Sequence, residues 1–120
     1  MARLVLRIDF DQGRALGPGK VRLLELVAET GSISAAGRAM GMSYRRAWLL
    51  VDAINHTFRE PAVETRGGGA GGGGASLTAF GANLVSRYRA MEHAARAALG
   101  QEMAQLEDAL APSPAASKPL

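Results

Sequence analysis

The chain contains no cysteine, and this absence excludes disulfide bonds and thiolate metal sites. Aromatic residues are also scarce, at 5% of the 120 residues, although 48% of the chain is hydrophobic. Alanine supplies much of that fraction, so we expect thin, closely packed helices around a modest core. No segment approaches the ~20 uninterrupted apolar residues of a membrane span. The composition therefore predicts a single cytoplasmic domain with neither a signal peptide nor a membrane-spanning helix.

Groups of residues that carry catalysis are missing as well. His56 and His93 are far apart in the sequence, and neither has a carboxylate or hydroxyl partner in a recognisable pattern. Glu107 and Asp108 are adjacent on a predicted helix, so their side chains diverge and cannot act as an acid/base pair across a substrate. No residue spacing matches a metal site. We therefore expect no enzyme activity, no metal and no cofactor.

Acidic residues are absent from two stretches that carry arginines. The net charge is only +3, but residues 30–51 and residues 65–91 contain no Asp or Glu and three arginines each. Such windows suit a polyanionic partner. A soluble surface with patchy charge would show the same pattern, so charge alone leaves both interpretations open.

The N-terminal part of the chain has the pattern of a strand followed by a helix. Apolar and charged side chains alternate over residues 4–10, which is typical of a half-buried strand. After a short loop, Pro18 suits the first turn of a helix predicted over roughly residues 18–30.

The middle of the chain predicts two helices joined by a tight turn, as in a helix-turn-helix. Ser32 or Ser34 caps the first helix, alanines in its middle allow close helix crossing, and Gly41 makes the turn. Ser43 caps the second helix, and Trp48 is predicted to anchor the core. The predicted core-facing stripe of this second helix, which Pro61 should end, is Tyr44, Ala47, Val51, Ile54 and Phe58. An ordinary helical hairpin in a bundle would show similar spacing.

A run of glycines follows, between two short strand-like segments. Seven of the fifteen glycines lie within residues 66–76. A phosphate-binding loop is disfavoured because the run has no lysine and the chain has no room for further βα units. A flexible linker is disfavoured because the run lies inside the only domain. The remaining interpretation is the tip of a β-hairpin, which turns the helix-turn-helix into a winged helix-turn-helix.

The last predicted element is a long helix over about residues 78–110, capped by Thr78. Its apolar face extends beyond what a small domain can cover, so we expect it to pair in a homodimer. The predicted dimerisation residues are Leu84, Tyr88, Met91, Ala95, Leu99, Met103 and Leu106. Residues 1–110 should form the folded domain. Residues 111–120 contain three prolines and no apolar stripe, and we expect a disordered tail.

Four motifs occur in one order along this chain: "GSISAAG", "SYRRAW", the glycine run ending in "GGGGA", and "LTAFGANL". Together they resemble the DNA-binding domain of ModE-type molybdate-responsive transcription regulators and, more distantly, the LysR-type helix-turn-helix. The resemblance covers about Leu4 to Leu110. It implies a mainly α fold with a small β component, namely a winged helix-turn-helix with a β-hairpin wing and a long C-terminal dimerisation helix.

This reading makes duplex DNA the expected partner. Arg45 and Arg46, in the first turns of the recognition helix, are expected to read base edges in the major groove, where arginine favours guanine. Hydroxyl groups and the backbone amides of a wing without Cβ atoms are expected to contact phosphates. The predicted DNA-binding residues are Ser32, Ser34, Ser43, Tyr44, Arg45, Arg46, Leu49, Arg66, Gly68, Gly69, Gly71 and Gly72.

The C-terminal region bears on what the chain senses. ModE-type regulators carry C-terminal oxyanion-binding domains, whereas this sequence ends in the proline-rich tail, so we expect no direct molybdate binding and regulation through a separate protein partner. Two other functions stay open. One is a protein-interaction module or antirepressor that pairs through the long helix without reading DNA. The other is a small nucleotide-binding protein that uses the glycine run, which a thermal-shift screen with nucleotides would detect.

Overall fold

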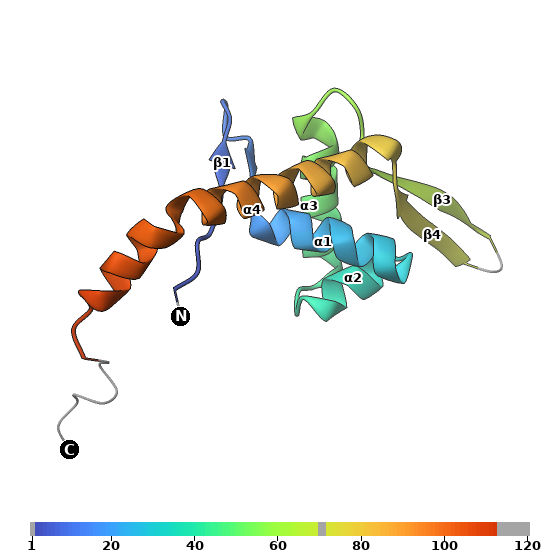
Figure 1. Cartoon of the computed structure of the whole chain (residues 1–120). Coiled ribbons are helices and arrows are strands. Elements are labelled where there is room, and N and C mark those ends of the chain that lie inside the picture. Colours follow the sequence, from blue (N-terminus) through green and yellow to red (C-terminus); the bar gives the residue numbers. More distant parts are fainter. Residues whose placement is uncertain (1, 70–71, 113–120) are drawn as a thin grey trace, which may run out of the picture.

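The computed structural model describes residues 2–69 and 72–112 and has a mainly helical fold with two small antiparallel hairpins (Figure 1). In chain order the elements are β1 (Ile8–Asp9), β2 (Ala15–Leu16), α1 (Pro18–Thr30), α2 (Ile33–Ala39), α3 (Tyr44–Thr57), β3 (Val63–Gly69), β4 (Gly72–Leu77) and α4 (Ala79–Asp108). The helices α2 and α3 form the helix-turn-helix, and the β3–β4 hairpin is its wing. The predicted winged fold is therefore confirmed. Most of the predicted disordered tail, residues 113–120, lies outside the described residues.

The helix boundaries follow from local signals in the sequence. Pro18 opens α1, and Gly31 ends it with a left-handed φ of 71°. The hydroxyl of Thr78 caps α4 by accepting a hydrogen bond from the amide of Gly81 at 2.9 Å. The third predicted helix was expected to continue to Pro61, but α3 already ends at Thr57.

The N-terminal segment forms much less strand than the alternation over residues 4–10 predicted. Only β1 pairs with β2, with Ile8 opposite Leu16. The preceding residues lie beside α4, where the carbonyl of Leu6 accepts a hydrogen bond from the buried hydroxyl of Tyr88. Leu6 packs against the core. The alternation thus places apolar side chains against a helix. Among the described residues, β2 is the strand that pairs with this segment, and it is only two residues long.

The core is built around α1. Val21, Leu23, Leu24 and Val27 are fully buried, and residues of α2, α3, the wing and α4 complete the same cluster. Burial of one such aliphatic side chain contributes ~1.5–3 kcal/mol. Helix α1 therefore connects the helix-turn-helix to both the wing and the first half of α4.

The wing is attached to α3 by one side chain. Asn55 Oδ1 accepts hydrogen bonds from the amides of Ala62 and Val63 at 2.8 and 3.0 Å, and Asn55 Nδ2 donates to the Val63 carbonyl at 3.0 Å. A further bond from the amide of Ala75 to the carbonyl of Gly31, at 2.9 Å, ties β4 to the end of α1. The wing is thereby held at a defined angle to α3.

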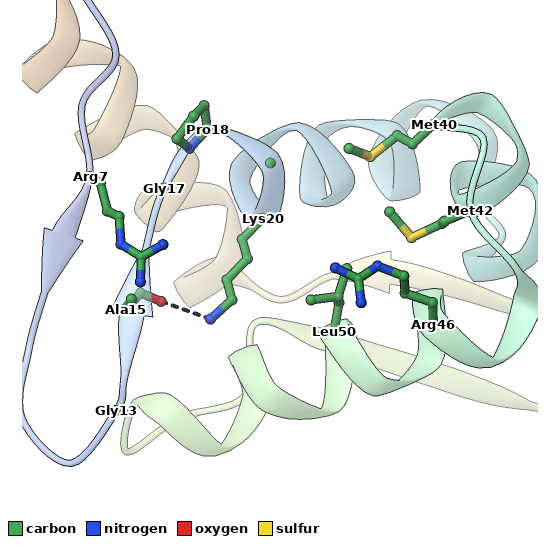
Figure 2. A pocket seen from close by; sticks show the side chains of 11 residues that line it. Arg7, Gly13, Ala15, Gly17, Pro18, Lys20, Met40, Met42, Arg46 and Leu50 are labelled. Carbon is green, nitrogen blue, oxygen red and sulfur yellow. Dashed lines mark hydrogen bonds between the residues drawn. The ribbon is translucent and has the colours of Figure 1, made fainter.

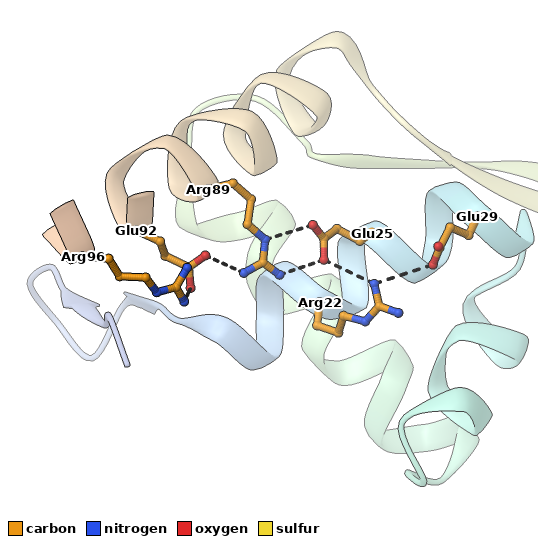
Figure 3. A network of polar contacts seen from close by, with 6 residues as sticks. All are labelled: Arg22, Glu25, Glu29, Arg89, Glu92 and Arg96. Atoms are coloured by element: carbon orange, nitrogen blue, oxygen red, sulfur yellow. Dashed lines mark hydrogen bonds and ion pairs between the residues drawn. The ribbon is translucent and has the colours of Figure 1, made fainter. Parts of the chain in front are cut away.

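An ion-pair network holds α4 against α1 (Figure 3). Arg89 donates two hydrogen bonds to Glu25, at 2.8 and 3.0 Å, and a third to Glu92 at 2.7 Å. Glu92 is only 5% exposed, so this contact is shielded from water. The hydrogen bonds from Arg89 lower the pKa of the Glu25 carboxyl below its ordinary value. Arg22, Glu29 and Arg96 extend the network at its two ends.

The second half of α4 extends beyond the helix-turn-helix (Figure 1), and the N-terminal residues lie beside it, where the amide of Ala2 donates a hydrogen bond to a carboxylate oxygen of Glu107 at 2.7 Å. At 1.5 Å per residue a helix of 30 residues is ~45 Å long, which exceeds the 37 and 27 Å of the two shorter molecular dimensions. The buried residues of α4 are Gly81, Leu84, Tyr88 and Glu92. The remainder of the helix therefore lies beyond the core.

Candidate nucleic-acid interface

Two serines cap the helices of the helix-turn-helix. The hydroxyl oxygen of Ser32 accepts from the amide of Ala35, and that of Ser43 accepts from the amide of Arg46, each at 3.1 Å. Each hydroxyl keeps its own proton for donation to an outside acceptor. Of the two predicted caps of α2, Ser32 is therefore correct, and Ser34 lies half-buried in the first turn.

The two helices cross most closely at Gly37. A Cβ placed there would lie 2.7 Å from the Cβ of Ala47, a distance that leaves room for glycine alone. Gly41 makes the predicted turn with a φ of 71°. Of the two alanines predicted at the crossing, Ala36 is fully buried and Ala35 half-buried. The sequence analysis did not assign Gly37 to the crossing, although a glycine one turn into the helix indicates a possible close contact with another helix.

Tyr44 and Trp48 lie on the surface of α3, which contradicts the core positions predicted for both. Tyr44 is 62% exposed and Trp48 is 38% exposed, and their rings pack edge to face with centroids 6.0 Å apart. They lie beside the buried stripe of α3, whose members are Ala47, Val51 and Ile54. The two rings consequently face the wing and not the core.

A groove separates the start of α2, the start of α3 and the wing, and we call it the wing groove. It has a volume of about 380 Å³. Its polar and aromatic lining consists of Ser32, Ser34, Tyr44, Trp48, Thr65 and Arg66. No carboxylate lines it. Four hydroxyls and one guanidinium thus converge on one concave surface, which suits a phosphate group.

Arg66 lies at the base of the wing. It is opposite Gly74 in the strand register, and a Cβ on Gly74 would lie 2.8 Å from its guanidinium Nη2. The guanidinium of Arg66 therefore lies over the position that a side chain at residue 74 would take, and a larger residue there would displace it. The sequence analysis named Arg66 but did not identify Gly74 opposite it, or the neighbouring Thr65, as part of this surface, because both assignments follow from strand pairing.

The predicted wing glycines lie at the far end of the hairpin. Gly68 and Gly69 belong to β3, Gly72 belongs to β4 and is paired with Gly69, and Gly71 lies outside the described residues. The strand register shifts between Arg66 and Gly69. Backbone without Cβ atoms can approach a sugar-phosphate chain closely.

The two predicted base-reading arginines lie in different surroundings. Arg45 is exposed and lines an open hollow with Leu49, which is 56% exposed. Arg46 instead lines a second pocket, at the side of α3 away from the wing (Figure 2). This basic pocket, as we call it, has a volume of about 430 Å³, and its lining includes Arg7, Lys20, Arg46, Met40, Met42 and Leu50.

Proteins similar to this chain carry names that refer to molybdenum or to transcription. The "Molybdenum transport protein ModE" of Azotobacter vinelandii is 37% identical over 103 residues, which are 86% of this chain and 38% of that protein. The "DNA-binding transcriptional dual regulator ModE" of Escherichia coli K12 is 36% identical over 87 residues, which are 72% of this chain and 33% of that protein. The "Molybdenum-pterin-binding protein MopB" of Rhodobacter capsulatus is 45% identical over 80 residues, which are 67% of this chain and 30% of that protein. The chain is a homologue of the N-terminal part of the ModE-type regulators.

The chain spans about a third of the length of the curated relatives it matches. No family model matches it. Among solved structures, the DNA-binding domain in the crystal structure of a CbnR_DBD–DNA complex, which is of the LysR type, has a TM-score of 0.56. The match covers 72% of this chain and 95% of that chain at 23% sequence identity. At this identity the likeness establishes the winged fold alone.

Two of the predicted dimerisation residues belong to the core of the fold. Leu84 and Tyr88 are buried against α1 and the N-terminal segment, so they offer no surface to a second chain, and their assignment was wrong. They share the apolar face of α4 with residues further along, and periodicity alone cannot show where the core ends. The rest of the predicted set reaches the surface wholly or in part, namely Met91, Ala95, Leu99, Met103 and Leu106.

Other kinds of site have little support in the described part of the chain. No three His, Cys, Asp or Glu residues gather there as metal ligands. None of the described helices is both long enough and apolar enough to cross a membrane. His56 has a partner after all, since its Nδ1 lies 3.4 Å from a carboxylate oxygen of Asp52, but both side chains are exposed on α3. This contact is a surface pair one turn apart, not a catalytic arrangement.

Proposed function

We propose that this chain is a sequence-specific duplex-DNA-binding transcription regulator of the ModE type that acts as a homodimer. The observation that supports it best is the surface of α3, whose outer face is open between two concave surfaces that contain cations and no carboxylate. A duplex presents a major groove between two phosphate strands, which matches this arrangement. Residues up to about 110 would form the DNA-binding unit.

Base reading is assigned to the outer face of α3. Arg45 is exposed there, and a bidentate contact with guanine contributes ~1–3 kcal/mol of discrimination. Leu49 lies one turn further along and suits the methyl group of thymine. Asp52 follows on the same side and would disfavour phosphate contacts at that position.

Phosphate contacts are assigned to the wing groove and to Ser43, the cap of α3. The capping hydroxyls of Ser32 and Ser43 can each donate a proton outward while they cap their helices. Ser34, Tyr44 and Arg66 would complete the contacts to one strand. The glycines of the wing would bring backbone amides to the neighbouring phosphates.

Homodimerisation is assigned to the second half of α4. Leu99 is 42% exposed and Leu106 is 71% exposed on the face that leaves the core. Replacing both with Glu should convert a dimer into a monomer in analytical ultracentrifugation. The matched control replaces Ala97 and Ala104, which are exposed on the opposite face, with Glu. A dimer that survives the first double substitution would refute this interface.

Molybdate is not expected to act on this polypeptide directly. The basic pocket contains three cations, and it is open, with its arginines exposed. A small oxyanion there would stay hydrated and bind weakly. Regulation would then depend on a separate protein partner.

The exposed leucines of α4 also favour a second candidate, a protein-interaction module that pairs through this helix without reading DNA. One experiment distinguishes the two functions. Sites are selected from a random duplex library, and binding of the selected and a scrambled duplex is compared by fluorescence anisotropy. An enriched motif bound at least about a thousandfold more tightly than the scrambled duplex supports the regulator. Failure to enrich any motif refutes it.

A further inference from the structure

The basic pocket lies on the flank of α3 opposite the wing groove. Successive residues of an α-helix are 100° apart, so Tyr44 and Trp48 face one flank, Arg45 and Leu49 face outward, and Arg46 and Leu50 face the other flank. The pocket linings separate Arg46 and Leu50, which line the basic pocket, from Arg45 and Leu49, which line the outer hollow; Tyr44 and Trp48 line both the wing groove and the outer hollow. The three surfaces of α3 therefore differ in chemistry.

We propose that the basic pocket binds a backbone phosphate of the DNA strand opposite the one in the wing groove, and that Arg46 contacts this phosphate and does not read a base. This inference rests on the proposed function. An α-helix with its side chains is ~10–12 Å wide and the major groove is ~12 Å wide, so a helix in the groove meets a phosphate strand on each flank. One flank has the wing groove, and the other has this pocket.

Three cations from distant parts of the chain line the pocket. Figure 2 shows Arg7, Lys20 and Arg46 around the same hollow, from the segment before β1, from α1 and from α3. None of the residues that line it is acidic. A phosphate there would meet no acidic lining residue, and the nearby Asp9 is paired with Arg7.

These cations have hydrogen-bonding capacity to spare. Lys20 Nζ donates one hydrogen bond, to the Ala15 carbonyl at 2.9 Å, and keeps two protons. Arg7 pairs with Asp9 through Nε at 2.8 Å, which leaves its two terminal nitrogens. The guanidinium of Arg46 has no hydrogen bond or ion pair with any described part of the chain.

The walls of the pocket are apolar. Met40, Met42 and Leu50 line it beside the aliphatic stem of Arg46 (Figure 2). Apolar walls direct the charged end of the side chain toward the opening. The pocket is too exposed to hold a free anion tightly, whereas a duplex that is already bound at the wing groove supplies its next phosphate at high effective concentration. The geometry therefore favours DNA over a small oxyanion.

Salt dependence tests the assignment. Affinities for the selected and the scrambled duplex are measured at 50 and 200 mM salt for the wild type, Arg46→Ala, Lys20→Ala and Arg45→Ala. The salt slope is the decrease in the logarithm of the binding constant with the logarithm of the salt concentration, and each lost phosphate contact lowers it by ~0.9. The factor by which affinity falls between the two salt concentrations should therefore be about 3- to 4-fold smaller for Arg46→Ala and Lys20→Ala than for the wild type. Both variants should weaken binding to the two duplexes by the same factor, while Arg45→Ala weakens the selected duplex more.

A matched control is Arg87→Ala, which removes the same charge from α4, where Arg87 bonds to Asn83 at 2.9 Å. Its salt slope should equal that of the wild type. Loss of affinity for the selected duplex alone in Arg46→Ala would overturn the proposal and make Arg46 a base reader. Absence of wild-type binding to any duplex would instead refute the proposed function itself.

Neutralised phosphates locate the contact. A methylphosphonate is placed at each backbone position of the selected duplex in turn. We expect one position that weakens binding of the wild type but not of Arg46→Ala or Lys20→Ala. If every position that affects the wild type affects both variants equally, the pocket does not bind a phosphate. Competition by micromolar inorganic phosphate would also overturn the proposal, since it would show a site for a free anion.

Discussion

Replacing Asn55 with Ala should detach the wing from α3. The Asn55 side chain makes the three hydrogen bonds that hold the start of β3, two as acceptor and one as donor. Ala62 and Val63, whose amides donate to it, are both buried. Water cannot easily replace the lost oxygen, so the substitution leaves two amides without an acceptor.

The size of the effect follows from these two amides. A buried donor left unsatisfied costs about 1–3 kcal/mol. Because Asn55 is itself half-buried, some water can enter, and we expect a loss of about 2–3 kcal/mol in the free energy of unfolding. In a domain of this size each kcal/mol lowers Tm by about 4–8 °C. Urea titration and thermal melting of Asn55→Ala should therefore show a large and cooperative loss.

The matched control is Asn83→Ala on α4, which removes an exposed amide whose oxygen accepts a hydrogen bond from Arg87. Its unfolding free energy should change by less than about 0.5 kcal/mol. DNA affinity of Asn55→Ala should also fall at temperatures where it remains folded, because the wing loses its angle to α3. Equal stabilities for the two variants would refute the assignment of Asn55 as the wing attachment.

Three other outcomes follow from the structure. Deleting residues 68–73 should leave the Tm nearly unchanged and lower both DNA affinity and its salt dependence, and an unfolded deletion variant would contradict a wing at the surface. The pKa of Glu25 is depressed below its ordinary value of 4.5, so its contribution to stability is present above pH 4.5 and is lost as the pH falls through the lower pKa of the folded state. In urea titrations from pH 6 to 3, the free energy of unfolding should therefore fall less steeply with pH for Glu25→Gln than for the wild type. Calorimetric titration with molybdate should show no binding with a Kd below about 1 mM, which corresponds to ~4 kcal/mol of favourable binding free energy. A stoichiometric signal with a micromolar Kd would refute this.

Local chemistry was enough to predict the order of the main elements. The capping hydroxyls of Ser32, Ser43 and Thr78 act on amides three residues away, and Gly41 sets its own φ. Such interactions lie within a few residues of chain, so the sequence displays both partners. The glycine run likewise specified a hairpin, because strand-like segments flank it and a helix-turn-helix precedes it.

The surfaces of the fold depended on contacts between distant residues. Tyr44 and Trp48 were assigned to the core by spacing, but whether a face of α3 is covered depends on where α2 and the wing are placed. Leu84 and Leu106 have the same place in the pattern of α4, and one is buried and the other exposed because the core packs against the first half of this helix, up to Glu92.

The sequence alone determined that the chain presents a helix-turn-helix with a glycine-rich wing, since helix caps, turn glycines and apolar periods are short-range properties. Tertiary structure decided which cations act together. Lys20 and Arg46 are distant in sequence but line one pocket, while the adjacent Arg45 lines another hollow, because neighbouring helical residues diverge by 100° and packing chooses what each of them meets.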